Sequence, residues 1–238
     1  MTVIIDAVGS KKAPDGWWMK TKTNMQRLYY IKGGTGYIKK DDGSTERFEK
    51  GYFYLHPYNL TANFINDPSD PLDHLYFDFL SAPAIISSEQ KKYAVSPAAK
   101  TVIDTVEECL SGYSLHDNKE LYSSLLSALL YLLSAESSLP TVNDKAILSA
   151  LDTVHSQYAS ALSVVQLASK SGFETNYFIR RFRKTMGVTP YAYLRTVRLI
   201  KAKELLDAGH PLSSTAEAVG YESSSSLSRA LKKSDIRA

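Results

Sequence analysis

Basic side chains concentrate in one segment of the chain, between positions 170 and 203. Nine lysines and arginines fall there, against a single acid, Glu174. Arginine can donate paired hydrogen bonds to guanine, and both lysine and arginine neutralise phosphate. The segment therefore has the chemistry that binding a polyanion such as DNA requires. The nine residues are Lys170, Arg180, Arg181, Arg183, Lys184, Arg195, Arg198, Lys201 and Lys203.

The basic excess belongs to the second part of the chain only. The 238 residues carry a formal net charge of +3. Residues 1–141 hold 14 basic and 17 acidic side chains, whereas residues 142–238 hold 14 basic and 8 acidic ones. This asymmetry indicates a near-neutral front domain and a back domain that binds a polyanion.

Helical spacing and glycine positions predict how the basic side chains are held. A short helix over 162–170, a turn at Gly172 and a second helix over 176–186 are typical of a helix-turn-helix. Phe178 and Phe182, four residues apart, mark the inner face of the second helix. The side chains turned outward are then Asn176, Ile179, Arg180 and Arg183.

The same pattern occurs a second time along the chain. LASKSGF at 167–173 matches TAEAVGY at 215–221, and NYFIRRFRK at 176–184 matches SSLSRALKK at 225–233. Between the copies, Thr189-Pro190 predicts the start of a helix that runs to Ala208, about 28 Å at 1.5 Å per residue. Two recognition helices on one rigid body can enter successive major grooves, about 34 Å apart. The duplication and the clustered arginines favour DNA binding over merely solvated amphipathic helices.

The front of the chain has the texture of β-structure between residues 26 and 79. Short aromatic and β-branched runs separated by glycine and aspartate turns predict a small barrel or sandwich. The segment His74–Leu80 alternates, with Leu75, Phe77 and Phe79 on one face and His74, Tyr76 and Asp78 on the other. The seven tyrosines of this region suit a saccharide, whose C–H face stacks on aromatic rings, although tyrosine is also common in half-buried strands.

Histidine and cysteine usage argues against an enzyme built on a metal site. Only His56 and His74 fall in the predicted barrel, and a catalytic metal needs three or more protein ligands. Cys109 is the single cysteine, which fits a reducing compartment. The N-terminal segment lacks a signal pattern, and no apolar run approaches the roughly 20 residues that span a bilayer. We therefore expect a cytoplasmic protein without a cofactor or membrane contact.

Two further helices are predicted at 97–111 and 117–135. The second is dense in leucine on more than one side, so it needs more than one partner. A second subunit and the preceding helix are equally good candidates. The short polar segment 137–144 contains Pro140 and is the best linker in the chain. We expect an α+β protein with a front domain at 1–136, a linker at 137–144 and an all-α back domain at 145–238.

Specific motifs run through residues 162–233. In the first unit and the connecting helix they are Leu167-Ala168, Gly172, Tyr177-Phe178, Arg181-Phe182-Arg183-Lys184, Gly187-Val188-Thr189-Pro190, Tyr193-Leu194, Arg198, Ala202 and Leu205-Leu206. In the second unit they are Ala216, Val219-Gly220-Tyr221, Leu227-Ser228-Arg229 and Leu231-Lys232. Together they resemble the AraC/XylS family of bacterial transcription regulators. The resemblance implies a domain that reads a bipartite DNA site near promoters, and no enzymatic activity.

Carried over by position, the resemblance assigns roles to side chains in both units. Base reading would fall to Asn176, Ile179 and Arg180 in the first unit and to Ser224, Ser225, Ser228 and Arg229 in the second. Arg183, Lys184, Lys232 and Lys233 would contact phosphate, which positions the protein without specifying sequence. Because the second unit is serine-rich, we expect residues 164–187 to supply most of the specificity.

The front half resembles the sugar-sensing, cupin-like β-barrel of the same family, followed by two dimerisation helices. This resemblance places Lys32, Asn63, His74 and Tyr76 at ligand-binding positions. We expect a homodimeric transcription regulator and activator that binds double-stranded DNA, responds to a saccharide and controls a carbohydrate-use operon, with RNA polymerase as a further partner. Two alternatives stay open: a regulator of the same family with a non-sugar effector or none, and a cupin-type metalloenzyme, which a bound metal would identify.

Overall fold

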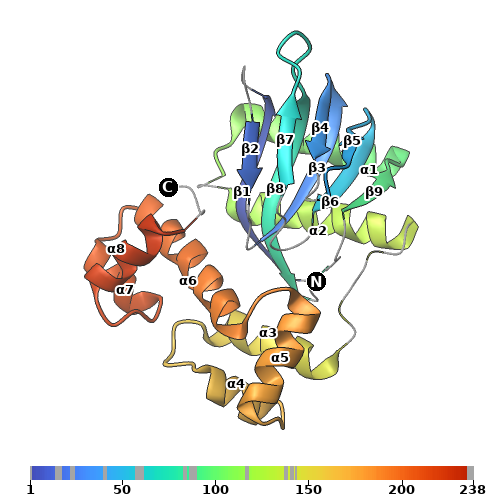
Figure 1. Cartoon of the computed structure of the whole chain (residues 1–238). Coiled ribbons are helices and arrows are strands. Elements are labelled where there is room, and N and C mark those ends of the chain that lie inside the picture. The colour runs from blue at the N-terminus through green and yellow to red at the C-terminus, as the bar shows by residue number, and fades with distance from the viewer. Residues whose placement is uncertain are drawn as a thin grey trace. The chain divides into compact units, whose positions relative to one another are not determined.

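The computed structural model describes residues 2–13, 18–21, 25–39, 42–56, 62–82, 85, 90–115, 118–136, 139, 142 and 144–234. These residues divide into two units, shown in Figure 1. The N-terminal unit comprises Met1–Ser81 and Ile85–Pro140, and the C-terminal unit comprises Ala82–Ala84 and Thr141–Ala238. The fold is α+β, as the sequence predicted: the sheets lie in the first unit, and the described residues 144–234 of the second form helices with connecting turns.

Two sheets form the N-terminal unit, and their described registers are antiparallel. The five-stranded sheet has the order β1 (Thr2–Lys12), β8 (Asp73–Ala82), β3 (Gln26–Gly33), β6 (Tyr52–His56) and β9 (Lys91–Ala94). The four-stranded sheet has the order β2 (Trp18–Thr21), β7 (Ala62–Asn66), β4 (Gly36–Lys39) and β5 (Thr45–Arg47).

The five-stranded sheet buries one face against helices. Leu75, Phe77 and Phe79 of β8 lie in one apolar core with residues of α1 (Pro97–Gly112) and α2 (Lys119–Glu136). The alternation predicted for this strand is therefore confirmed. Burying one such side chain stabilises the fold by about 1.5–3 kcal/mol, so this face is a large part of what holds the unit together.

The other face of the same sheet meets the four-stranded sheet. Tyr29, Ile31 and Tyr54 on this face share a second core with Ile38 of β4 and Phe64 of β7. Successive strand residues therefore serve different layers, because side chains alternate with a period of two. The unit has the layer order helices, sheet, sheet, and its inter-sheet space is lined largely by aromatic rings.

The leucines of α2 are accommodated within the chain itself. Leu126, Leu130 and Leu133 are fully or almost fully buried in the core shared with α1 and the sheet. Of the two candidates, the preceding helix is thus enough to cover them. Tyr131 stays 71% exposed on the outer side of the helix.

Six helices form the C-terminal unit, and their ends follow from local capping. They are α3 (Lys145–Gln157), α4 (Val164–Lys170), α5 (Thr175–Met186), α6 (Pro190–Asp207), α7 (Leu212–Ala218) and α8 (Ser224–Lys232). Thr189 caps α6 and Pro190 occupies its first turn, as predicted. Helix α4 begins at 164 rather than 162 because Ser163 and Gln166 form a capping box.

The long helix α6 is the centre of this unit (Figure 1). Phe178 and Phe182 of α5 are fully buried, and the Phe182 ring lies 6.0 Å from that of Tyr193 on α6. On the second half of α6, Leu199 and Ala202 pack with residues of α7 and α8, including Leu227. Both helix-turn-helix units are therefore attached to the same helix.

Only part of the predicted linker falls within the described residues. Positions 137, 138, 140, 141 and 143 lie outside them. Leu139 packs into the core of the N-terminal unit, and Asp144 caps α3. None of the helices in the described part of the chain has the length and apolar character needed to cross a membrane.

Candidate nucleic-acid interface

Helix α5 presents a polar, basic face to solvent. Its buried side consists of Phe178, Phe182 and Met186. Helix geometry then forces the residues between them outward. Of the side chains predicted to contact DNA, Asn176, Arg180, Arg183 and Lys184 are exposed and Ile179 is partly buried.

One arginine of α5 is used inside the protein instead. The Arg181 Nε atom donates to Asp144 Oδ2 at 2.7 Å, and Nη1 donates to the Tyr177 hydroxyl at 3.0 Å. Its guanidinium also lies 5.0 Å from the centre of the Phe173 ring. The hydrogen bond from Arg181 lowers the pKa of the Asp144 carboxyl. Arg181 thus ties α5 to the start of α3.

Helix α8 offers a different kind of surface. Ser225, Arg229 and Lys232 are exposed, whereas Ser224 and Ser228 are partly buried. Ser223 and Ser226 form the capping box of the helix, so their hydroxyls are already hydrogen-bonded. The Arg229 Nε atom donates to the Ser225 carbonyl, which holds the arginine along the helix. This face can donate and accept hydrogen bonds but carries fewer charges than α5.

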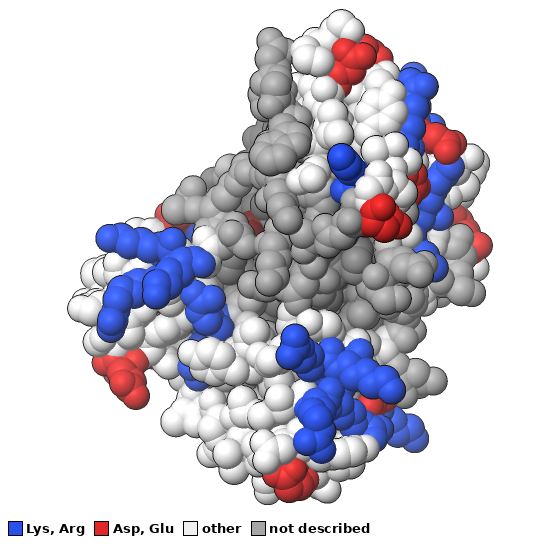
Figure 2. Space-filling view, viewed as in Figure 1, with Lys and Arg blue, Asp and Glu red and all other residues white. Residues whose placement is uncertain are grey.

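Basic side chains of the two helices lie on one side of the C-terminal unit. Figure 2 shows one blue group over α8 and another over α5, with largely uncharged surface between them. A duplex that follows one face of this unit would meet both groups. This is the arrangement that a bipartite major-groove site requires.

Two arginines of α6 tie this helix to other parts of the C-terminal unit. The Arg198 guanidinium donates to the carbonyls of Tyr158 and Ser160 at 2.8 and 2.9 Å. Burial lowers the pKa of Arg198. The turn at Gly220 lies against the same loop, and a Cβ added there would be 2.9 Å from the Ala159 carbonyl oxygen. The second arginine, Arg195, donates to the Ala230 carbonyl of α8 at 2.9 Å.

The inter-sheet space of the N-terminal unit gathers two of the four predicted ligand-binding residues. His74 and Tyr76 both point into it from β8, their rings 6.0 Å apart. Tyr29 and His56 join them: the Tyr29 ring lies 4.7 Å from His74 and 5.0 Å from His56. These two were missed by sequence reasoning. The alternation Tyr52, Tyr54, His56 could have placed His56 there.

Both histidines are held neutral by burial. Burial lowers the pKa of His56 to about 3 and that of His74 to about 4. The two ring nitrogens of His56 are buried and lack a hydrogen-bond partner in the described part of the protein. A buried polar group without a partner is costly, and a polar ligand would remove that cost.

The other two predicted ligand-binding residues lie elsewhere. The Lys32 ammonium contacts Asp73 at 3.0 Å, Glu107 of α1 at 2.9 Å and the Ser10 hydroxyl at 2.7 Å, so it faces the helical layer. Asn63 directly precedes Phe64 on β7, and the Phe64 side chain lies in the inter-sheet core. Alternation therefore turns Asn63 to the opposite face of its sheet. The structure does not bring Lys32 or Asn63 to His74 and Tyr76.

Similarity to known proteins is concentrated in the helical unit. A family model described as a helix-turn-helix domain matches residues 167–234. An AraC-like transcription regulator of Streptomyces antibioticus is 35% identical over 91 residues, which are 38% of this chain and 30% of that protein. The multiple antibiotic resistance protein MarA of Salmonella typhimurium is 30% identical over 85 residues, which are 35% of this chain and 67% of MarA.

The whole fold also has a solved counterpart. ToxT from Vibrio cholerae, in a crystal structure with a bound unsaturated fatty acid, aligns with 98% of this chain and 91% of its own. The TM-score is 0.56 and the sequence identity is 11%. At this identity the likeness is one of fold, which extends over both units.

Proposed function

The chain belongs to the AraC family of DNA-binding transcription regulators, and we propose that it controls a carbohydrate-use operon in response to a small effector. The observation that carries this is the pairing of two exposed helix faces, on α5 and α8, with one connecting helix, α6. Such a unit positions two readers on one duplex. The effector would bind between the two sheets of the N-terminal unit.

In this proposal α5 reads bases through Asn176, Ile179 and Arg180, with Arg183 and Lys184 on phosphates. Helix α8 reads through Ser224, Ser225, Ser228 and Arg229, with Lys232 on a phosphate. A bidentate arginine–guanine contact discriminates by about 1–3 kcal/mol. The exposed arginines of α5 make it the stronger reader, and α8 mainly anchors the protein.

We favour a saccharide as the effector. Tyr29, His56, His74 and Tyr76 combine aromatic faces with buried polar atoms, and the nitrogens of His56 lack partners among the described residues. Sugar hydroxyls supply such partners, whereas an acyl chain does not. A fatty acid is the second candidate because the ToxT structure contains one. Its carboxylate would need a cation. The nearby Arg27 is already paired with Asp78 at 2.7 Å, whereas the Lys11 ammonium lies 5.0 Å from the centre of the Tyr76 ring.

The proposal also covers the oligomeric state, the cell compartment and the contact with RNA polymerase. The regulator acts as a homodimer in the cytoplasm and, as an activator, contacts RNA polymerase. Tyr131 on the outer side of α2 offers an exposed aromatic surface for the second subunit.

The test has two measurements. Duplexes selected by the full chain from a random library should show a bipartite footprint, and Arg180→Ala should weaken protection of the half that α5 contacts. A panel of saccharides and fatty acids should then be screened by thermal unfolding. An effector at 100 times its Kd adds about 2.7 kcal/mol of stability. Failure to select any duplex would overturn the DNA-binding assignment, and a response to fatty acids alone would replace the saccharide.

A further inference from the structure

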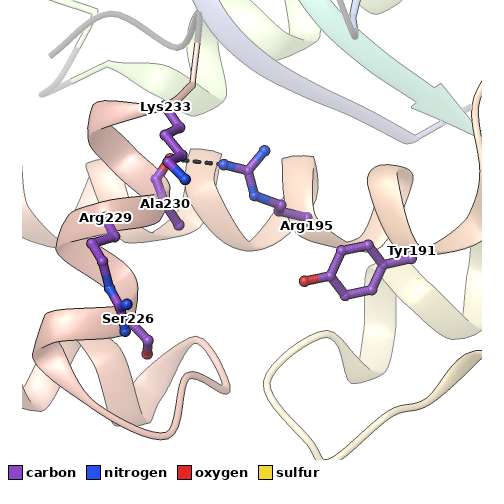
Figure 3. A pocket seen from close by; sticks show the side chains of 6 residues that line it. All are labelled: Tyr191, Arg195, Ser226, Arg229, Ala230 and Lys233. Atoms are coloured by element: carbon purple, nitrogen blue, oxygen red, sulfur yellow. Dashed lines mark hydrogen bonds between the residues drawn. The ribbon is translucent and has the colours of Figure 1, made fainter.

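An open cleft of about 490 Å³ lies between α6 and α8 (Figure 3). Three of its six lining residues are cationic and none is acidic. The lining residues are Tyr191, Arg195, Ser226, Arg229, Ala230 and Lys233. A concave surface with one sign of charge concentrates oppositely charged groups.

Two of the three cationic groups are hydrogen-bonded to the protein. One nitrogen of Arg195 donates to the Ala230 carbonyl at 2.9 Å, and the Arg229 Nε atom donates to the Ser225 carbonyl. A guanidinium has five N–H donors, so each arginine keeps others for an anion. Ser226 contributes shape only, because its hydroxyl is used in the capping box of α8.

Tyr191 has no role in the core. It occupies the first turn of α6 and is 65% exposed, whereas Tyr193, two residues on, is buried. Figure 3 shows its hydroxyl directed toward the α8 side of the cleft. A phenol there can donate a hydrogen bond to an anion that the arginines attract.

The cleft lies on the path between the two readers. Tyr191 follows α5 after the turn Gly187–Thr189, and the other side of the cleft is α8 itself. When two helices enter successive major grooves, the DNA backbone between the grooves passes the connecting element. A phosphate is thus the anion that docking would bring to this place.

We propose that this cleft binds a phosphodiester of the DNA backbone between the two half-sites. The inference rests on the proposed function and adds Tyr191 and Arg195 to the residues that serve it. It also gives Lys233, already expected to contact phosphate, a place beside them. Arg195 and Lys233 neutralise the phosphate, and Tyr191 donates a hydrogen bond to it. Arg229, which also lines the cleft, keeps its base-reading role. The contact positions the duplex and is independent of base sequence.

The test uses the full chain and a fluorescently labelled duplex that the protein selects from a random library. Lys233→Gln should weaken binding and lower the slope of log K against log salt by about 0.9. Tyr191→Phe removes only the hydroxyl, so affinity should fall about fivefold with an unchanged slope. Lys50→Gln and Tyr113→Phe remove the same groups from exposed sites on the N-terminal unit and should bind as wild type. Arg195 is left intact because it also holds α8.

A second arm replaces one phosphate at a time by a neutral methylphosphonate. The wild type should lose affinity at a phosphate between the half-sites, and Tyr191→Phe should lose no more at that position, because the two changes remove the same contact. Equal binding by all four variants would overturn the proposal. The proposal would also fail if the cleft bound inorganic phosphate but every methylphosphonate duplex bound the wild type as tightly as the unmodified duplex. If the wild type binds no duplex at all, the proposed function itself fails.

Discussion

At the scale of single residues, the arginines of the basic segment do two different things. Arg180 and Arg183 extend from α5 into solvent, whereas Arg181 and Arg198 are hydrogen-bonded within the protein. Charge counts along the sequence cannot separate these roles, because partners such as Asp144 and the Tyr158 carbonyl come from elsewhere in the chain. The outward direction of Arg180 followed from helical spacing alone.

Arg180→Ala should weaken specific DNA binding by about 1–3 kcal/mol and leave nonspecific binding almost unchanged, because it removes a base contact. Lys184→Ala should weaken both and lower the salt slope by about 0.9, because it removes a phosphate contact. Anisotropy titrations at several salt concentrations, with a selected and a scrambled duplex, distinguish the two effects. An unchanged footprint in Arg180→Ala would remove it from the recognition surface.

The buried histidines make the N-terminal unit sensitive to acid. His56 and His74 titrate near 3 and 4 in the folded protein and near 6.5 when unfolded, so the unfolded chain binds protons first. Their stabilising effect is complete above pH 6.5 and is lost as the pH falls toward 4. Between pH 7.5 and 5 each should cost about 2 kcal/mol.

Urea unfolding at the two pH values measures this loss. Burial also lowers the pKa of His155 on α3 to about 4, so three histidines contribute in the full chain. His56→Gln removes one of them and should keep roughly two thirds of the wild-type pH dependence. Carboxylates protonate below this window and do not obscure the comparison. Equal stability at both pH values would show that the histidines are solvated.

At the scale of elements, strand alternation and helix capping were the most informative signals. They placed His74 and Tyr76 on the inner face of β8 and Thr189 at the start of α6, because both depend only on neighbours in sequence. Lys32 and Asn63 could not be placed in this way. The β3–β8 register shifts between Ile31 and Gly33, Glu107 approaches from α1, and the face that Asn63 takes depends on which sheet β7 joins.

The turns of the two helix-turn-helix units should respond differently to a methyl group. Gly172 and Gly220 both have positive φ, at 73° and 78°, so alanine costs about 1–2 kcal/mol of strain at either. Only at Gly220 would the new Cβ also lie 2.9 Å from the Ala159 carbonyl oxygen. Gly220→Ala should therefore lower the free energy of unfolding more than Gly172→Ala does. Thermal unfolding of the two variants measures this difference. Equal losses of stability would mean that the loop at Ala159 moves to accommodate the methyl group.

At the scale of the whole molecule, the sequence already separated a near-neutral part from a basic part. The two parts carry formal charges of −3 and +6. Regulation requires that an effector bound in the first part change the DNA affinity of the second, and this happens only if the effector binds two states with different affinity. Which effector does so depends on the inter-sheet space. Tyr29 and His56 come to line it through the pairing of β3 with β6, which the sequence pattern alone did not predict.

Tyr76→Ala should abolish the effector response and leave DNA binding intact, because its ring lines the inter-sheet space and lies in the unit without the readers. Titration of the selected duplex with and without effector measures both properties. Tyr37→Ala, on the face of β4 opposite the buried Ile38, tests whether the loss of any tyrosine has this effect. A normal response in Tyr76→Ala would exclude the ring from the effector site.

Arg198 donates hydrogen bonds to the loop at Tyr158 and Ser160, beside the Gly220 turn. These contacts bear on the spacing between the two recognition helices, and so on the spacing of the half-sites that they can reach. The loop precedes α4, Arg198 lies on α6 and the Gly220 turn precedes α8, so these contacts connect the two helix-turn-helix units. One extra base pair between half-sites turns the second site by about 35° around the helix axis, given about 10–10.5 base pairs per turn. The protein would then have to twist the DNA or give up one half-site, so we expect the operators that it binds to share a fixed helical phase.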